Sequence, residues 1–502
     1  MASRENFPSF ISPDRTIPEL TLKAILVGLF LAIILGAANA YLGLYAGMTV
    51  SAIIPGAVMA LALLKPFKGT ILEVNLATMG AAAGECVAAG VIFTIPALVL
   101  LGAWTEIQLL ETSLISLLGG LLGVLWMVPL RRALVVKTKL PFPEGVAVAA
   151  VLTTTVGGVT AGKQKDTNSG IWLLVGAIFS GLYKFGELSL NIFRGTIESI
   201  ISIGSFSIGQ ETNKAWIYGG VTTSPALLGV GWIIGPKIAS YVLVGGLIGW
   251  VIIAPLIALA TGLPTPLSAE TISNALAMGQ GNLTVGTNIW GFFEIWGTQI
   301  RYIGVGAMLV GGLWAIWTIR HNLVDSVKEA LIGLKGGQTE IKKRTEEDLR
   351  YKLVFTFIVL LTIPIFLLYL WLSNLFGISL LMAVITIGFA FLASALAGYL
   401  TGLVGSSNCP ISGVTVAVLL IVSVFMLLLG VTGPEGMAIV IFISAVICIG
   451  GSISGDLLQS MACGQMLGAT PKKLQIMMTL GVIAISGTVG IVIGVLHEAF
   501  TI

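Results

Sequence analysis

Long apolar stretches, separated by short polar ones, run through almost the whole chain. A helix needs about 20 apolar residues to cross the roughly 30 Å hydrocarbon core of a bilayer, whereas barrel strands alternate every second residue. The pattern therefore predicts an all-α polytopic membrane protein with about 15 transmembrane or re-entrant helices. The expected apolar segments are residues 22–47, 48–64, 72–103, 112–130, 142–158, 170–189, 216–235, 238–261, 269–290, 296–319, 352–373, 377–402, 412–430, 436–470 and 473–496.

Four regions differ from a simple transmembrane helix. Segments 72–103 and 436–470 are too long and too rich in glycine for one straight helix, so we expect breaks in both. Segment 269–290 is too polar to face lipid. Residues 190–215 include Arg194, Glu198, Glu211 and Lys214, and this charge favours a position at the membrane interface.

The composition supports the membrane assignment and excludes other classes. Charged residues make up 10% of the 502 positions and hydrophobic residues 56%. A soluble domain has about 25% charged residues, so an ordinary soluble enzyme and a disordered chain are both excluded. The formal net charge of +3 is too small to indicate a nucleic-acid partner.

Lys and Arg are concentrated in four polar stretches, of which Arg320–Lys352 is the longest. Cytoplasmic loops carry an excess of these residues, so we expect all four stretches, and the N-terminus, on the cytoplasmic side. The C-terminus is then expected outside, provided that segment 269–290 crosses the membrane. The other three stretches contain Arg131, Arg132, Lys137 and Lys139, then Lys65 and Lys68, and finally Lys472 and Lys473.

Short motifs of the first third recur in the same order in the last third, although chance similarity between Gly- and Leu-rich segments is an alternative explanation. The predicted topology inverts the two copies, as in many secondary transporters, whose substrate sites lie near the membrane midplane. The matching pairs are Tyr41-Leu42-Gly43-Leu44 with Tyr399-Leu400-Thr401-Gly402-Leu403, Ile54-Pro55-Gly56 with Ile411-Ser412-Gly413, Gly84-Glu85 with Gly455-Asp456, and Ile95-Pro96 with Thr470-Pro471. The expected organisation is a first repeat at 1–160, middle membrane helices at 161–319, a charged cytoplasmic loop at 320–352 and a second repeat at 353–502.

Four acidic side chains lie in or beside apolar segments, where a charge is costly and usually faces a cavity or a partner. Glu85 and its repeat counterpart Asp456 follow small residues, and we expect them to couple transport to protons; hydrogen bonding to backbone amides is the structural alternative. Glu144 follows Pro143 at a helix start, where it can cap the helix or contact substrate. Glu187 stands three residues after Lys184, which favours an ion pair.

Several uncharged polar residues could contact a substrate. Residues 402–410 interrupt an apolar run with glycines, hydroxyls, Asn and Pro, which predicts an unwound segment beside a cavity; a plain loop between two helices is the alternative. Together with Glu144, the candidate substrate-binding residues are Asn39, Asn75, Ser406, Ser407, Asn408 and Gln459.

The sequence indicates neither a metal site nor a cofactor. Cys86, Cys409, Cys448 and Cys463 lie in or beside apolar runs and form no CxxC pair. The two histidines, His321 and His497, belong to no HExxH motif. A clustered set of His, Cys and carboxylate ligands is therefore not expected.

Long motifs occur in order from end to end. They are Glu19-Leu20-Thr21-Leu22-Lys23, Gly36-Ala37-Ala38-Asn39-Ala40-Tyr41-Leu42-Gly43-Leu44, Gly84-Glu85, Ala88-Ala89-Gly90-Val91-Ile92-Phe93-Thr94-Ile95-Pro96, Leu140-Pro141-Phe142-Pro143-Glu144-Gly145, Tyr399–Asn408, Gly455-Asp456-Leu457-Leu458-Gln459 and Gly468-Ala469-Thr470-Pro471. With these motifs the chain resembles the oligopeptide transporter family, which includes the yellow-stripe-like metal-chelate carriers, and most of all its prokaryotic members. The match is weaker over residues 160–370. The Asn-Pro-Gly motif of the eukaryotic peptide branch is absent, and Asn408-Cys409-Pro410 stands where related chains often have Asn-Asn-Pro.

The resemblance implies a secondary carrier driven by a proton gradient, not an enzyme. It implies a small peptide or a peptide-like metal chelate as substrate, protons and the lipid bilayer as partners, and the cell membrane as location; homo-oligomer formation stays open. A gated channel for small polar solutes is one alternative. A remote one is an intramembrane aspartyl protease, but residue 453 is Ile where a GxGD motif requires Gly.

Overall fold

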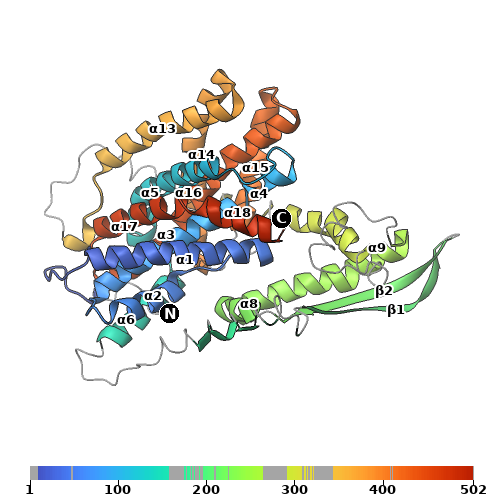
Figure 1. Cartoon of the computed structure of the whole chain (residues 1–502), viewed down its shortest axis with the longest axis horizontal. Helices are drawn as coiled ribbons and strands as arrows, with labels where there is room; N and C mark the ends of the chain where they lie inside the picture. Colours follow the sequence, from blue (N-terminus) through green and yellow to red (C-terminus); the bar gives the residue numbers. More distant parts are fainter. Residues whose placement is uncertain are drawn as a thin grey trace. The chain divides into compact units, whose positions relative to one another are not determined.

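The computed structural model divides the chain into two compact units, one formed by Met1–Leu173 with Leu309–Phe500 and the other by Leu174–Met308. Each unit is described by itself (Figure 1). The structure describes residues 9–46, 49–138, 140–157, 175–176, 178–180, 182–183, 186, 192, 196–208, 211–223, 225–263, 291–307, 310–311, 314, 317–318, 320, 343–406, 409 and 411–500.

Within these residues, 8 helices are long and apolar enough to cross a membrane. This confirms a helical membrane protein, while the total of about 15 segments and the proposed domain boundaries stay predictions. The spans are Leu22–Leu44, Ile71–Leu100, Leu109–Val136, Gly235–Thr261, Arg344–Ser373, Phe376–Val404, Gly433–Leu467 and Pro471–Ala499.

The N-terminal part of the first unit forms α1 (Leu22–Ala46), α2 (Ile53–Leu64), α3 (Ile71–Ile92) and α4 (Pro96–Leu100). The break between α3 and α4 confirms that segment 72–103 is not one straight helix. Pro96 occupies the start of α4, where its missing N–H costs no helical hydrogen bond. α3 begins with a capping box, in which Thr70 and Glu73 each accept a hydrogen bond from the other's backbone N–H.

α5 (Leu109–Leu130) runs directly into the π-helix η2 (Arg131–Val136). The loop predicted at Arg131 is therefore wrong, because this residue is helical and 2% exposed. The carboxylate of Asp348 compensates its charge and lets the helix bury it. α6 (Pro143–Gly157) follows after a short connection in which the backbone N–H of Phe142 donates to the carbonyl of Gly402 over 2.9 Å.

In the C-terminal part of the first unit, segment 436–470 is a helix as predicted but has no break. α16 is a continuous helix of 35 residues, so the break expected in segment 436–470 is wrong. Its glycines allow neighbouring helices to approach: a Cβ on Gly123 of α5 would lie 2.5 Å from the carbonyl oxygen of Gly450. The elements here are η5 (Arg344–Glu346), α13 (Tyr351–Ser373), α14 (Phe376–Val404), α15 (Ile411–Leu428), α16 (Gly433–Leu467), α17 (Pro471–Ser486) and α18 (Val489–Phe500).

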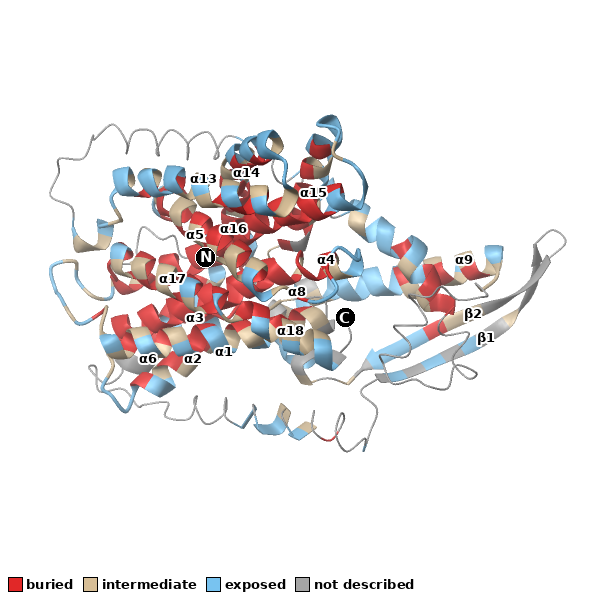
Figure 2. Ribbon diagram, turned by 45° about the horizontal axis from the view of Figure 1, so that its top comes forward, coloured by how far each residue is buried: buried red, intermediate tan, exposed pale blue. Residues whose placement is uncertain are grey.

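α3 and α16 form the centre of the first unit and are its most deeply buried helices (Figure 2). α1 and α2 pack against α3, and α14 and α15 pack against α16. The helices that contain the matching motifs thus make corresponding contacts, while the repeat itself stays a prediction. The inverted orientation of the repeats stays a prediction.

The second unit contains a β-hairpin, which corrects the all-α prediction for this part of the chain. β1 (Thr196–Ile208) pairs antiparallel with β2 (Glu211–Thr222), and a register irregularity lies between Ser202 and Gly204. Residues 190–215 were expected at the membrane interface and segment 216–235 as a helix. The repeated isoleucines of β1 suit a strand better, because β-branched residues favour strands. The remaining elements are α8 (Pro225–Leu247), η3 (Ile248–Ile253), α9 (Ala254–Thr261) and η4 (Trp296–Ile300).

Candidate functional site

The two proton-coupling candidates lie close to the same cysteine thiol at the centre of the first unit. Glu85 and Cys86 belong to α3 and Asp456 to α16, and each residue is at most 2% exposed. Sγ of Cys86 lies 3.4 Å from Oδ2 of Asp456 and 3.7 Å from Oε2 of Glu85. The two packed helices thereby bring together residues that are 370 positions apart.

Polar groups of the N-terminal helices orient the Glu85 carboxylate. The side-chain amide of Asn39 in α1 donates to Oε1 of Glu85 over 3.0 Å, and the backbone N–H of Ala52 donates to Oε2 over 3.4 Å. Oδ1 of Asn39 in turn accepts from the backbone N–H of Val50 over 3.0 Å. The candidate substrate residue Asn39 therefore lies at the site and connects Glu85 to the start of α2.

Asp456 has a different environment. Its Oδ1 is buried and accepts no hydrogen bond of normal geometry from the described residues. Ser406, which lies just beyond α14, is 6% exposed and interacts with Asp456. No ion pair among the described residues includes Glu85 or Asp456. The site therefore contains two carboxyl groups and one thiol without a neighbouring cationic side chain in the part of the chain that is described.

Gln459 connects two further elements beside this group. Its Oε1 accepts from the backbone N–H of Gly145 over 2.9 Å, and its Nε2 donates to the carbonyl of Thr401 over 2.6 Å. The side chain thus joins the start of α6 to the end of α14. Glu144 is close by, since a Cβ on Gly405 would lie 2.8 Å from its Oε1. Gly405 has a φ of 93°, which ends α14 and which residues other than glycine rarely adopt.

The remaining predicted residues either lie outside the described residues or form no hydrogen bond to Glu85 and Asp456 within them. Asn75 is buried in α3, but its Nδ2 lies near Gly464 and no hydrogen bond to the described residues joins it to Glu85 or Asp456. Ser407, Asn408 and Glu187 lie outside the described residues. The helix break predicted at 402–410 is present, because α14 ends at Val404 and α15 begins at Ile411.

The structure also adds Cys86 to the candidate site, a role that the sequence did not suggest. Glu85, Cys86 and Asp456 form a group of potential metal ligands whose atoms all lie within 4.8 Å of one another. The expectation that such ligands do not cluster is therefore wrong for these three. The adjacency of Glu85 and Cys86 was visible in the sequence, but the approach of Asp456 depends on the packing of α3 against α16.

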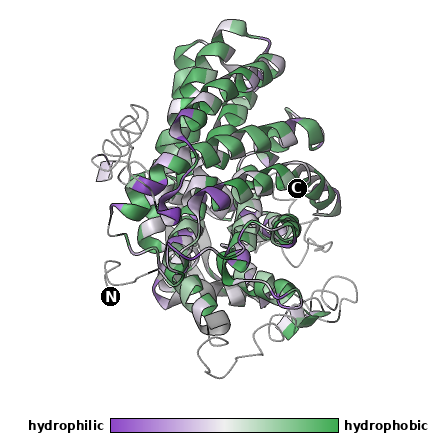
Figure 3. Cartoon of the chain, turned by 90° about the vertical axis from the view of Figure 1, so that its left-hand side faces the viewer, coloured by the Kyte–Doolittle hydropathy of each residue, from purple (hydrophilic) through white to green (hydrophobic). Residues whose placement is uncertain are grey.

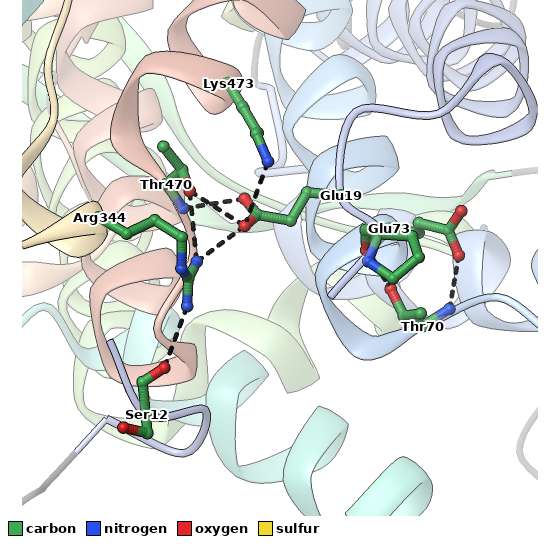
Figure 4. A network of polar contacts seen from close by, with 8 residues as sticks. Ser12, Glu19, Thr70, Glu73, Arg344, Thr470 and Lys473 are labelled. Atoms are coloured by element: carbon green, nitrogen blue, oxygen red, sulfur yellow. Dashed lines mark hydrogen bonds and ion pairs between the residues drawn. The ribbon is translucent and has the colours of Figure 1, made fainter. Parts of the chain in front are cut away.

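A second polar network lies at one end of the unit, where the carboxylate of Glu19 connects three segments (Figure 4). Oε1 accepts from Nη1 of Arg344 over 2.7 Å and lies 3.5 Å from Nζ of Lys473, while Oε2 accepts from the backbone N–H of Thr470 over 3.0 Å. Glu19 is 3% exposed. The end of the charged stretch 320–352 is therefore fixed against the helices, which corrects its assignment as a simple solvated loop for Arg344.

At the same end of the unit, Lys23 contacts the connection between α2 and α3. Its Nζ lies 3.1 Å from Oε2 of Glu73 and donates to the carbonyl of Phe67 over 3.0 Å. Polar residues gather at this end between the apolar helices (Figure 3). Hydrogen bonds and ion pairs thus bring together at this end the stretches that contain Lys65, Lys473 and Arg344. The positive-inside rule assigns all three stretches to one side of the membrane.

Comparison with known proteins gives two findings. The family model described as "OPT oligopeptide transporter protein" matches residues 19–502. A protein of Haemophilus influenzae named "Putative oligopeptide transporter" is 30% identical over 483 residues, which cover 92% of this chain and 70% of the relative. Both matches include the residues of α3 and α16 described above.

Proposed function

The chain belongs to the oligopeptide transporter family, and from that premise we propose that it is a proton-coupled carrier for small peptides or peptide-like metal chelates in the cell membrane. Family membership makes the protein a transporter and not an enzyme. The observation that supports proton coupling is the burial of Glu85 and Asp456 beside Cys86, without a cationic partner among the described residues.

Uncompensated charge at such a site is costly, because a buried ion loses its hydration. Two species can neutralise it during transport: a proton, or the ammonium group of a zwitterionic substrate. A carrier that alternates between these two states couples the movement of one to the movement of the other. In this proposal Glu85 and Asp456 hold the proton, and substrate binding occurs beside them.

The neighbouring elements suit a peptide. Helix amino ends attract a carboxylate, and the start of α6 lies beside Gln459. Ser406 stands in the break between α14 and α15, close to Asp456. Asn39, Glu144, Ser406 and Gln459 are therefore the described residues that we assign to substrate binding. Asn75, Ser407 and Asn408 remain candidates from the sequence.

Uptake by purified protein in lipid vesicles tests this function. With an acidic exterior, we expect labelled peptides or chelates to accumulate in the vesicles. Accumulation should fall to the level without a gradient in Glu85→Gln and Asp456→Asn. Glu435→Gln is the matched control, because Glu435 lies on α16 as well but is exposed. The proposal is wrong if the wild-type protein accumulates nothing while a related carrier does so in parallel.

The same vesicles separate a carrier from a channel. A carrier should show uptake that saturates with substrate concentration and accumulates substrate against its gradient when protons flow inward. A channel would only equilibrate the substrate.

A further inference from the structure

We infer that Glu85, Cys86 and Asp456 form a binding site for a thiophilic divalent transition-metal ion, of which Zn²⁺ is the type. Each residue offers one ligand atom, and all three atoms lie within 4.8 Å of one another. The sulfur lies 3.4 Å from Oδ2 of Asp456 and 3.7 Å from Oε2 of Glu85.

These separations fit a tetrahedral zinc centre. Zinc lies about 2.3 Å from a thiolate sulfur and about 2.0 Å from a carboxylate oxygen. At the tetrahedral angle, a sulfur and an oxygen bound to one zinc ion are therefore about 3.5 Å apart. The two observed separations of 3.4 and 3.7 Å lie on either side of this value. The two carboxylate oxygens lie within 4.8 Å of each other, and they bind one tetrahedral ion when their separation is about 3.3 Å.

The proton count of the site supports a cation there. A thiol has one proton and can donate it to only one acceptor at a time, yet Sγ of Cys86 lies within hydrogen-bond distance of carboxylate oxygens of both Glu85 and Asp456. No ion pair among the described residues supplies a positive charge to either carboxylate. A divalent ion would satisfy the sulfur and both carboxylates at once.

Groups around the three ligands are placed as outer-shell partners of a metal site. Asn39 and the backbone N–H of Ala52 hold the carboxylate of Glu85 in its orientation, and such partners fix ligand geometry at metal centres. A second observation comes from Asp456, which is 1% exposed and whose Oδ1 accepts no hydrogen bond of normal geometry from the described residues. This buried oxygen is available to an ion or to a ligand of that ion.

The ligand types determine which ions fit. A thiolate favours zinc and other soft ions, whereas carboxylates and carbonyls alone suit Mg²⁺ and Ca²⁺. Three protein ligands leave one tetrahedral position open, as in catalytic zinc sites. An amine, carboxylate or thiol of a transported molecule could occupy that position. In this last respect the inference rests on the proposed function; binding of the ion itself does not.

Cobalt spectroscopy on the full-length protein in detergent, after removal of any affinity tag, tests the inference. Co²⁺ bound by a thiolate in a tetrahedral site gives a sulfur-to-cobalt charge-transfer band and intense visible bands. We expect these bands in the wild type and their loss on addition of Zn²⁺. They should be absent from Cys86→Ser and strongly weakened in Asp456→Asn. Cys463→Ser is the matched control, because Cys463 is equally buried in α16 but lies outside the three-residue group.

A second variant guards against misfolding of Cys86→Ser. A protein in which Cys409, Cys448 and Cys463 are changed to Ala should keep the cobalt bands. Zn²⁺, but not Mg²⁺, should raise its Tm and that of the wild type. The inference is wrong if the wild type shows neither a sulfur-to-cobalt band nor an increase in Tm with Zn²⁺. It is also wrong if the band and the increase in Tm are both retained in Cys86→Ser.

This test is independent of the vesicle uptake experiment. If the wild-type protein binds no metal but takes up substrate along the proton gradient, the metal site is rejected and the carrier function is kept. Metal binding in a protein that moves no peptide or chelate would keep the site and reject the proposed function.

Discussion

Arg131 and Asp348 form a two-pronged ion pair, in which Nε donates to Oδ1 over 2.8 Å and Nη2 donates to Oδ2 over 2.6 Å. Their side chains are 3% and 6% exposed. Gln475 adds a third hydrogen bond, from its Nε2 to Oδ1 over 2.7 Å. The pair thereby attaches the segment before α13 to the end of α5 and to α17.

Removing one partner of this pair should destabilise the protein strongly. In Asp348→Asn the buried Arg131 loses its countercharge, and such a change typically costs about 3–5 kcal/mol. The exposed pair Lys472–Glu347 provides the contrast, since its side chains are 46% and 51% exposed. Lys472→Gln should cost at most about 1 kcal/mol. Reversible unfolding in mixed micelles measures both free energies. Equal losses of unfolding free energy in the two variants would contradict the stabilising role of the Arg131–Asp348 pair.

The bridge made by Gln459 should be needed for the contact between α6 and α14. Gln459→Met keeps the approximate volume but leaves the N–H of Gly145 and the carbonyl of Thr401 without this partner. An unsatisfied buried polar group costs about 1–3 kcal/mol, so we expect a lower unfolding free energy. Gln465→Met is the matched control, because Gln465 lies on α16 as well but its Oε1 has no hydrogen-bond partner among the described residues. An equal loss in Gln465→Met would contradict the role of the two Gln459 hydrogen bonds.

The sequence predicts the membrane architecture well because hydrophobic length is a local property. Runs of apolar residues located α1, α13 and α14 to within a few residues. The length of segment 72–103 predicted a break for an equally local reason, and the structure places it just before Pro96. Glycine was misleading in α16, because there it serves contact between helices, which depends on the partner helix.

The site was only half predictable for the same reason. Glu85 and Asp456 stand out as isolated acids in apolar segments, so their types alone mark them. Cys86 gains its significance from Asp456, which lies 370 residues away. Position in the fold likewise distinguishes Asn39, which contacts Glu85, from Asn75, which has no hydrogen bond to it in the described structure.

Close helix contact makes Gly84 intolerant of any side chain. A Cβ at this position would lie 2.0 Å from the backbone carbonyl oxygen of Ala32 in α1. Gly84→Ala must therefore push α1 away from α3 beside Glu85, at a cost of at least about 1–3 kcal/mol. Gly388 is the control, because it lies in α14 with nothing within 4 Å of a Cβ. Tm measurements should show a clear loss in Gly84→Ala and none in Gly388→Ala.

The basic stretches should all face the cytoplasm, and helix direction shows which residues lie at the other end. α13 begins beside Asp348 and extends for 23 residues, or about 35 Å at 1.5 Å per residue. Asn374 must then lie at the far end from Lys472. α5 ends at Arg131, which places Glu106, before its start, at that far end as well.

Cysteine labelling with a membrane-impermeant maleimide checks this orientation. In intact cells we expect labelling of Glu106→Cys and Asn374→Cys, but not of Lys65→Cys or Lys472→Cys; inside-out vesicles should give the reverse. All four positions are exposed, whereas Cys86, Cys448 and Cys463 are buried, so the wild type measures the background from the native cysteines. Labelling of positions 65 and 472 from opposite sides would contradict the fold. Labelling of both from outside would keep the fold and reverse its orientation in the membrane.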